Sequence, residues 1–517
     1  MRFGGFPLGI GLGLGLASAA ALSVPGRVVP TASLEMALPP AAYNAPRPAG
    51  LHASPMAAAQ LASLSLGGPY VPLSFMNGLP EPSGAPLTID FSSDPVLRLG
   101  RETVSADALR ALLAKVVTEH AVIREATAGE RQARAARGEA RSGYLPTLDI
   151  TLLGDRSLAR DFGNDPGNEL ERIRPEGRVD ALASVQQNLF DFGATGRRIS
   201  AAGARLRAAS AEVDQAADQL ALNTIAAWYD VLGYQALVDL GEALAASQRG
   251  LRDNVAERVR QGVASQGDVA RVETYVATAE ARLARFHRAL DSARMRYQEL
   301  AGSPAPRALG RPELPDALPN SVGGARAASA SSPAVIAAEA RAAAARQDWR
   351  AAKADNLPKL SASVDAGRYG VFETDRDYDV RGRLVLRQRL FGGGGNSRAK
   401  QAEAEAAGAA AMADRIRDEA ARDAAIAFSD VDALQRQLKA LDDAYRANRR
   451  SRDVLVARFQ AARGTLYDVL AAEDQYFEIA TEYIRAVTEL DAARYVLLSR
   501  TGQLLPALGI SVPRGRA

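Results

Sequence analysis

The segment "QGVASQGDVARVE", residues 261–273, has a close counterpart in "AARGTLYDVLAAE", residues 461–473. Four identities recur at a constant spacing of 200 residues, namely Arg258 and Arg458, Asp268 and Asp468, Val269 and Val469, and Glu273 and Glu473. Each copy follows one long alanine-rich run and precedes another. A repeat of this kind predicts two similar units, each made of a helix, an acidic corner and a second helix.

Further motifs recur in the same order in both halves of the chain. "YLPTL" at 144–148 matches "NLPKL" at 356–360, "NLFDFG" at 188–193 matches "RLFGGG" at 389–394, and "AWYDV" at 227–231 matches "AFSDV" at 427–431. The duplication therefore predicts a domain order, which is a first repeat over residues 97–302, a Pro/Gly-rich linker at 303–331, a second repeat over 332–509 and a tail at 510–517.

The uninterrupted runs before the two corners are predicted to be long helices with coiled-coil spacing. A strict seven-residue step joins Leu206, Val213, Leu220, Ala227 and Tyr234, which is typical of a coiled-coil seam. The core of an ordinary helical bundle shares this spacing. A helix of about 67 residues rises ~1.5 Å per residue and reaches roughly 100 Å, however, which is far longer than a small domain.

Four segments have the alternation of β-strands, near residues 144–159, 179–192, 357–372 and 380–392. In "VRGRLVLRQRLF", strand periodicity places Arg381, Arg383, Arg387 and Arg389 on one side and mostly apolar side chains on the other. This pattern is typical of a transmembrane β-strand with a wet interior, although a small α+β sheet is an alternative. Four strands cannot close a barrel, and open edges are not tolerated in lipid. We therefore expect several copies to share one barrel.

The N-terminus predicts export. Arg2, the apolar stretch 6–16 and the small residues 17–19 form a secretory signal peptide over residues 1–21. Residues 22–96 are rich in Pro and Ala and are predicted to be disordered. No other segment approaches the ~20 apolar residues of a membrane-spanning helix.

Composition argues against several classes of function. There is no cysteine, so disulfides, thiol catalysis and a lipid-modified cysteine anchor are excluded. The three histidines, His52, His120 and His287, are far apart, and "FGGGGNSRAK" at 391–400 lacks the ending of a phosphate-binding loop. The 63 basic and 60 acidic residues are interspersed, which does not indicate nucleic-acid binding. Solvated or packed histidines are therefore favoured over a catalytic or zinc site, and these patterns do not favour an enzyme, a cofactor or a metal site.

Together these motifs resemble the TolC-like family of bacterial outer-membrane efflux and secretion channels, over residues 100–505. The resemblance implies a mainly α fold with transmembrane β-structure. Duplicated long-helix coiled-coil hairpins would form a trimeric α-barrel, and four strands per protomer would enter a shared twelve-stranded β-barrel in the outer membrane. The helical tube would extend into the periplasm.

The resemblance also implies which residues matter at the two corners, which it places at a periplasmic tip that closes and opens. The tip residues are Gln266, Asp268, Phe459, Arg463, Gly464 and Asp468. The two aspartates match acidic constriction positions, where up to six carboxylates of a trimer would meet. The alternative is structural, with each aspartate acting as a helix N-cap.

The closed-state lock of the family is incomplete in this chain. Phe459 and Gly464 stand where relatives often have tyrosine and arginine, and Ala471 replaces an acidic residue. We hypothesise that Arg463 substitutes by pairing with an acidic group of a neighbouring helix.

The resemblance implies a passive exit duct of a tripartite export system. Its partners would be a periplasmic adaptor and an inner-membrane transporter, of the ABC type if "VASQGDVARVE" indicates type I protein secretion. Multidrug or polysaccharide efflux is the alternative within the family, and a periplasmic coiled-coil scaffold without a pore is the alternative outside it.

In such a trimer, four arginines per chain would place twelve positive charges in the lumen of the barrel. These charges would favour anionic cargo, and the alternative is that the arginines are solvated and confer no selectivity.

Overall fold

The computed structural model describes residues 79–80, 83, 86–163, 166–169, 176–307, 309–373 and 377–514. The chain separates into two units, residues 1–64 and 65–517, and all described residues belong to the second. The predicted signal peptide and most of the Pro/Ala-rich segment lie outside the described residues.

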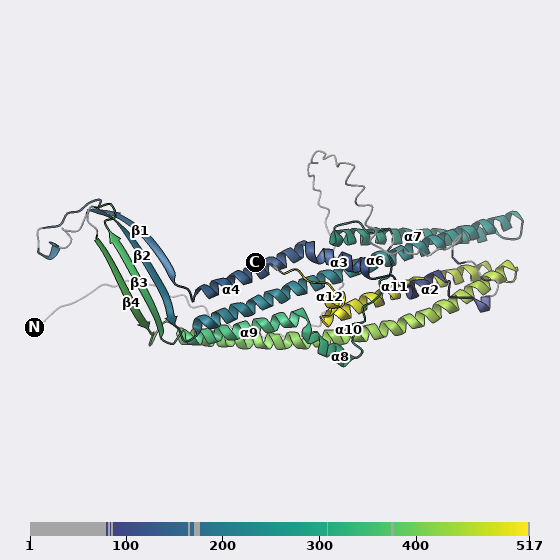
Figure 1. The fold of residues 1–517 in the computed structure, drawn as a ribbon. Coiled ribbons are helices and arrows are strands. Elements are labelled where there is room, and N and C mark those ends of the chain that lie inside the picture. Colours follow the sequence, from purple (N-terminus) through teal and green to yellow (C-terminus); the bar gives the residue numbers. More distant parts are fainter. Residues whose placement is uncertain are drawn as a thin grey trace, which may run out of the picture. The chain divides into compact units, whose positions relative to one another are not determined.

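Two long helical hairpins make up most of the second unit. The first consists of α6 (Ala194–Arg260) and α7 (Gln266–Ala301), and the second consists of α10 (Gly395–Gln460) and α11 (Leu466–Arg500). The helices of each hairpin pack along one another and are joined by a short turn (Figure 1). The buried residues of α6 include many alanines, and such small side chains let neighbouring helices approach closely.

Shorter helices extend this arrangement. α4 (Ala121–Ser142) packs against α6, and α9 (Pro333–Ala354) packs against both α6 and α10. Two helices lie before the sheet, α3 (Asp107–Glu119) and then α4, with a break between them at His120. The break occurs because His120 has an extended backbone and its Nδ1 accepts a hydrogen bond from the N–H of Val122. The remaining short elements are α2 (Pro95–Arg101), α8 (Val322–Ala328), α12 (Leu504–Ala507), η2 (Pro86–Thr88), η3 (Pro166–Asn168) and η4 (Ser329–Ser331).

One antiparallel sheet combines strands from both repeats, in the order β1-β2-β3-β4. The strands are β1 (Thr147–Arg156), β2 (Gly177–Phe190), β3 (Lys359–Tyr369) and β4 (Asp377–Arg387). Each strand is continuous with a long helix, because α4 leads into β1, β2 leads into α6, α9 leads into β3, and β4 leads into α10 (Figure 1). The sheet therefore lies at one end of these helices, and β1 and β4 are its edges.

The hydrophobic core lies where the two hairpins meet. One cluster surrounds Trp228 and Tyr297 and includes side chains of α3, while a second surrounds Leu237 and Phe477. The Trp228 indole N–H donates to the carbonyl of Gly310 at 3.1 Å, which satisfies its buried polar group. Within the described residues, no helix combines the length and the apolar character needed to cross a bilayer.

The last part of the predicted disordered segment is ordered, so the prediction for residues 22–96 was wrong there. Leu79, Phe91, Val96 and Leu97 are buried in the cluster around Phe477. The Pro-rich composition was misleading because a few apolar side chains suffice to anchor a short segment when the two hairpins offer an apolar surface.

Candidate functional site

The outer face of the sheet is apolar and exposed. Strand register places one apolar set on this face, namely Leu148, Ile150, Leu152, Val185, Val364, Val380, Leu384 and Leu386. Ile150 is 76% exposed and Leu384 is 73% exposed. Leaving this much apolar surface in water costs about 25 cal/mol per Å². A contiguous face of this kind indicates contact with lipid or with another apolar surface.

The opposite face is polar, and it corrects the expected arginine ladder. Arg381, Arg383 and Arg387 lie on this face, but Arg389 follows the last residue of β4 and is not part of the strand. Arg381 pairs with Asp379, and Arg383 pairs with Asp365 at 2.5 Å. The Ser184 hydroxyl also donates to Asp365, at 2.7 Å.

Acidic and basic side chains on the polar face nearly balance. Its carboxylates are Asp149, Asp155, Asp180, Asp365, Asp377 and Asp379, and its basic groups are Arg178, Lys359, Arg381, Arg383 and Arg387. The arginines of β4 are therefore accompanied by carboxylates, because neighbouring strands supply the acids.

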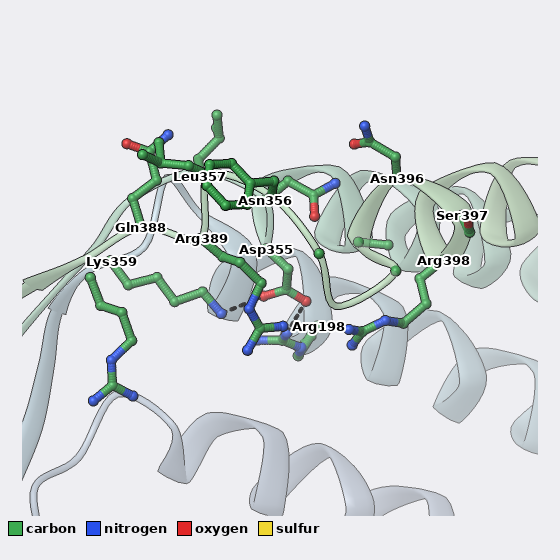
Figure 2. A pocket seen from close by; sticks show the side chains of 17 residues that line it. Arg198, Asp355, Asn356, Leu357, Lys359, Gln388, Arg389, Asn396, Ser397 and Arg398 are labelled. Carbon is green, nitrogen blue, oxygen red and sulfur yellow. Dashed lines mark hydrogen bonds and ion pairs between the residues drawn. The ribbon is translucent and has the colours of Figure 1, made fainter. Parts of the chain in front are cut away.

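Positive charge is instead concentrated where the strands end. A cavity of about 1060 Å³ at this junction contains the basic residues Arg198, Lys359, Arg387, Arg389 and Arg398 and the carboxylate of Asp355. Asp355 pairs with Arg198 and with the Lys359 ammonium, the latter at 2.7 Å. Figure 2 shows Arg198, Arg389 and Arg398 directed to the same side of the loop that follows β4. Of these three only Arg389 was predicted, although "RQRLFGGGGNSR" has arginines on both sides of its glycines.

The two corners are built identically around a capping box. Ser265 is the N-cap of α7 and Thr465 is the N-cap of α11, and each hydroxyl accepts a hydrogen bond at 3.2 Å from the backbone N–H of the aspartate three residues later. The carboxylates of Asp268 and Asp468 in turn accept hydrogen bonds from the backbone N–H groups of Ser265 and Thr465, at 3.0 and 3.4 Å. The alternative that each aspartate is itself the N-cap is wrong, because the hydroxyl residues hold that position. Ser265 and Thr465 were missed, although their spacing to the aspartates is the capping-box pattern.

The hydrogen bonds of the first corner stabilise the ionised form of Asp268. The backbone N–H and the hydroxyl of Ser265 donate to this carboxylate, at 3.0 and 2.8 Å. These donors hold the pKa of Asp268 below its ordinary value. The carboxylate of the first corner is therefore ionised at neutral pH.

Among the remaining residues of the tip, Phe459 makes a contact between the two hairpins. The guanidinium carbon of Arg258, at the end of α6, lies 4.5 Å from the centre of the Phe459 ring at the end of α10. A Cβ at Gly464 would lie 3.1 Å from the backbone nitrogen of Phe459, so a larger residue requires the turn to shift. Gln266 begins α7. Arg463 is exposed and has no ion-pair partner in the part of the protomer that the structure describes.

A strand pattern with an exposed apolar face and a charged face, continuous with helical hairpins of this length, defines a membrane-embedded channel protein with a long helical extension. The chain matches the model of the outer membrane efflux protein family over residues 112–303 and 325–503, and it belongs to that family. It is therefore an outer-membrane protein with helices that extend into the periplasm, and its family is one of channels rather than enzymes. The resemblance to TolC-like channels, and the duplicated-hairpin fold predicted from it, are confirmed.

Individual relatives agree with this assignment. The outer membrane efflux protein BepC of Brucella suis is 24% identical over 414 residues, covering 79% of this chain and 88% of BepC. A membrane protein from Pseudomonas aeruginosa has the same fold, with a TM-score of 0.69 and 22% identity over 86% of this chain and 99% of its own. The outer membrane protein VceC of Vibrio cholerae also has this fold, with a TM-score of 0.67 and 20% identity. The match covers 78% of this chain and 97% of VceC.

Proposed function

We propose that three copies of this chain form a passive exit duct in the outer membrane. The observation that supports this most directly is the sheet, whose apolar face is exposed and whose edge strands, β1 and β4, have no partner strand in the described part of the protomer. Unpaired edges are not tolerated in lipid, so β4 of one copy must pair with β1 of the next until the barrel closes. Twelve strands in three copies satisfy this requirement.

The test is ion conduction by purified protein in planar lipid bilayers. We expect detergent-extracted trimers that insert and give discrete current steps. A periplasmic scaffold without a pore, the alternative from another class, would be soluble without detergent and give no steps. That result would remove the duct proposal.

We infer that the duct works with a periplasmic adaptor and an energised inner-membrane transporter, as its membership of the outer membrane efflux protein family implies. Two cargo classes remain candidates. The corner "VASQGDVARVE" favours type I protein secretion with an ABC transporter. The relative BepC is named an outer membrane efflux protein, which favours the alternative of multidrug or polysaccharide efflux. Crosslinking in the native envelope, followed by co-purification, separates them by the class of transporter that is recovered.

We propose that Asp268 and Asp468 form the acidic constriction of the tip. Both are held by a capping box, and three copies would bring six carboxylates near one axis. Arg463, exposed at the second corner, would pair with an acidic group of a neighbouring copy in the closed state. Arg463→Glu is then expected to raise the closed-state current, and an unchanged current would count against this pairing.

The sheet itself is proposed to be weakly selective between cations and anions, because its polar face is nearly balanced. Arg383→Gln removes the ion-pair partner of Asp365 and should shift the reversal potential in asymmetric salt toward cation preference. A strong preference for anions that persists in this variant would contradict a polar face on which acidic and basic side chains nearly balance.

A further inference from the structure

The cavity at the sheet–helix junction has an excess of positive charge that the described protomer does not compensate. Lys359 and Arg387 lie directly opposite each other on β3 and β4, and like charges in such a pair repel. The carboxylate of Asp355 compensates Lys359 and Arg198. Within the described residues, Arg387 and Arg389 have no carboxylate partner. The exposed Arg387 and Arg389 therefore give the cavity an uncompensated positive charge, which favours an anion there.

The donors converge from three elements. Arg198 is in the first turns of α6, Arg389 follows β4, and Arg398 is in the first turn of α10. Arg398 also donates to the carbonyl of Gly393, which fixes its position in the turn. Guanidinium groups present planar forks that match oxyanions, and the first turn of a helix adds free backbone N–H groups and a positive dipole end.

The glycine turn leaves room for these side chains. Gly393 has a φ of +69°, and a Cβ at this position would lie 2.4 Å from Nη1 of Arg389. Any other residue would therefore displace the Arg389 guanidinium as well as strain the backbone. Gly393 thus both turns the chain and allows the position of Arg389.

We propose that this cavity binds a phosphate- or sulfate-type oxyanion, either free or as a substituent of an exported molecule. Arg389 and Arg398 contact the oxyanion, and Arg387 compensates its second charge. Asp355 does not compete, because Arg198 and Lys359 hold it at the side of the cavity (Figure 2). Since Lys359 and Arg387 belong to the polar face of the sheet, the cavity lies on that face. Its place on an export path rests on the proposed function, whereas the binding itself does not.

The test is calorimetric titration of the purified full chain with inorganic phosphate at low ionic strength. We expect saturable phosphate binding by the wild type. The double variant Arg389→Gln/Arg398→Gln, which lacks two charge-assisted contacts, should bind phosphate with an affinity at least about tenfold lower. Arg381→Gln/Arg383→Gln is the matched control, because it also removes two positive charges, but from side chains already paired with Asp379 and Asp365. Its phosphate affinity should stay within about twofold of the wild type.

A second variant separates geometry from charge and protects the test against misfolding. Arg389→Lys/Arg398→Lys keeps both charges but loses the forks, so its affinity should fall between those of the wild type and the glutamine variant. Thermal midpoint and elution volume of each variant are compared with those of the wild type. Equal affinity of the wild type and the glutamine variant would overturn the site.

Further titrations identify the source of the oxyanion. Binding of both inorganic phosphate and a phosphate monoester supports recognition of a substituent on cargo, and binding of inorganic phosphate alone supports a free-ion site. Acetate or chloride binding as tightly as phosphate would overturn the proposal, since the cavity would then be only a region of positive potential. No phosphate binding by the wild type would also overturn it.

Bilayer recordings on the same wild-type preparation keep this proposal separate from the duct. If the protein conducts ions but binds no phosphate, the proposal of an oxyanion site is wrong and the proposal of a duct stands. If the protein binds phosphate but never conducts ions, the proposal of a duct is wrong and the proposal of an oxyanion site stands.

Discussion

Asp94 and Arg449 form a buried ion pair although they are 355 positions apart in the chain. Asp94 caps α2 by accepting from the N–H groups of Val96 and Leu97, at 3.0 and 3.1 Å, and it also accepts from the hydroxyl of Tyr445 at 2.9 Å. Nearby, Arg452 of α10 donates to the carbonyl of Pro80 at 2.8 Å. These contacts fasten the segment before α2 to the second hairpin.

Asp94→Asn is expected to loosen this segment. The change leaves the Arg449 guanidinium buried without a countercharge, which costs about 3–5 kcal/mol. We expect a lower thermal midpoint and faster proteolytic cleavage within residues 79–97. Asp107→Asn is the control, because the Asp107 side chain is 82% exposed and its pairing with Arg110 contributes little. Equal cleavage rates for Asp94→Asn and wild type would show that the ion pair does not hold the segment.

The two roles of the corner aspartates can be separated by mutation. Ser265→Ala/Thr465→Ala removes both caps, at about 0.5–2 kcal/mol each, but keeps both carboxylates. Asp268→Asn/Asp468→Asn removes the charges and keeps both hydroxyls. If the carboxylates form a constriction, only the asparagine variant shifts ion preference away from cations in bilayer recordings. The same shift in the alanine variant would mean that capping alone explains the conservation of this corner between the two repeats.

The contact between Arg258 and Phe459 predicts a role in holding the tip hairpins together. Arg258→Gln removes a cation–π interaction of about 0.5–1 kcal/mol. We expect more frequent openings in single-channel recordings. Arg458→Gln, at the exposed corresponding position of the second repeat, should leave the opening frequency unchanged. A similar increase in both variants would show that general loss of positive charge at the tip is responsible.

Glu473 predicts a specific dependence of stability on pH. Burial raises the pKa of this carboxyl, against the smaller opposing effects of Arg452 and of the Ser247 hydroxyl, which donates to it at 3.2 Å. Gln248 of α6 donates to its other oxygen at 2.7 Å. Because the folded state holds this proton more tightly than the unfolded state, the contribution to stability is complete below the unfolded pKa of about 4.3 and is lost as pH rises through the folded pKa.

Glu473→Gln is therefore expected to raise the thermal midpoint at about pH 8 and to flatten its dependence on pH above the unfolded value. Thermal unfolding at several pH values checks this. Glu273→Gln, at the exposed corresponding position of the first repeat, is the control and should change neither. A lower midpoint for Glu473→Gln at pH 8 would mean that the ionised carboxylate stabilises the helix contact through Arg452.

Local patterns in the sequence predicted the hairpins and the strands well. The seven-residue step from Leu206 to Tyr234 and the alternation around Arg383 each depend on neighbours within one helix or strand. The acidic partners of the arginines could not be predicted in the same way. Whether Asp365 lies beside Arg383 depends on which strands are adjacent and in what register, which no single segment specifies.

The same limit applies to the missed contacts. Asp94 was placed in a disordered segment because its partner, Arg449, is distant in sequence and its neighbours are prolines and small residues. The junction cavity combines Arg198 of α6 with Asp355 beyond α9 and Arg398 of α10. Only the meeting of the two repeats in one sheet brings these groups together.

The central claim is that β4 of one copy pairs with β1 of the next in a barrel of three copies, and crosslinking tests it most directly. The chain has no cysteine, so Thr151→Cys on β1 and Val385→Cys on β4 supply the only thiols. The crosslinker is a bismaleimide shorter than three strand spacings of about 4.8 Å, which cannot join both edges of one protomer. We predict covalent dimers and trimers, with nothing larger, from the double variant in membranes, and monomers from each single variant. Monomers alone from the double variant would contradict the shared barrel.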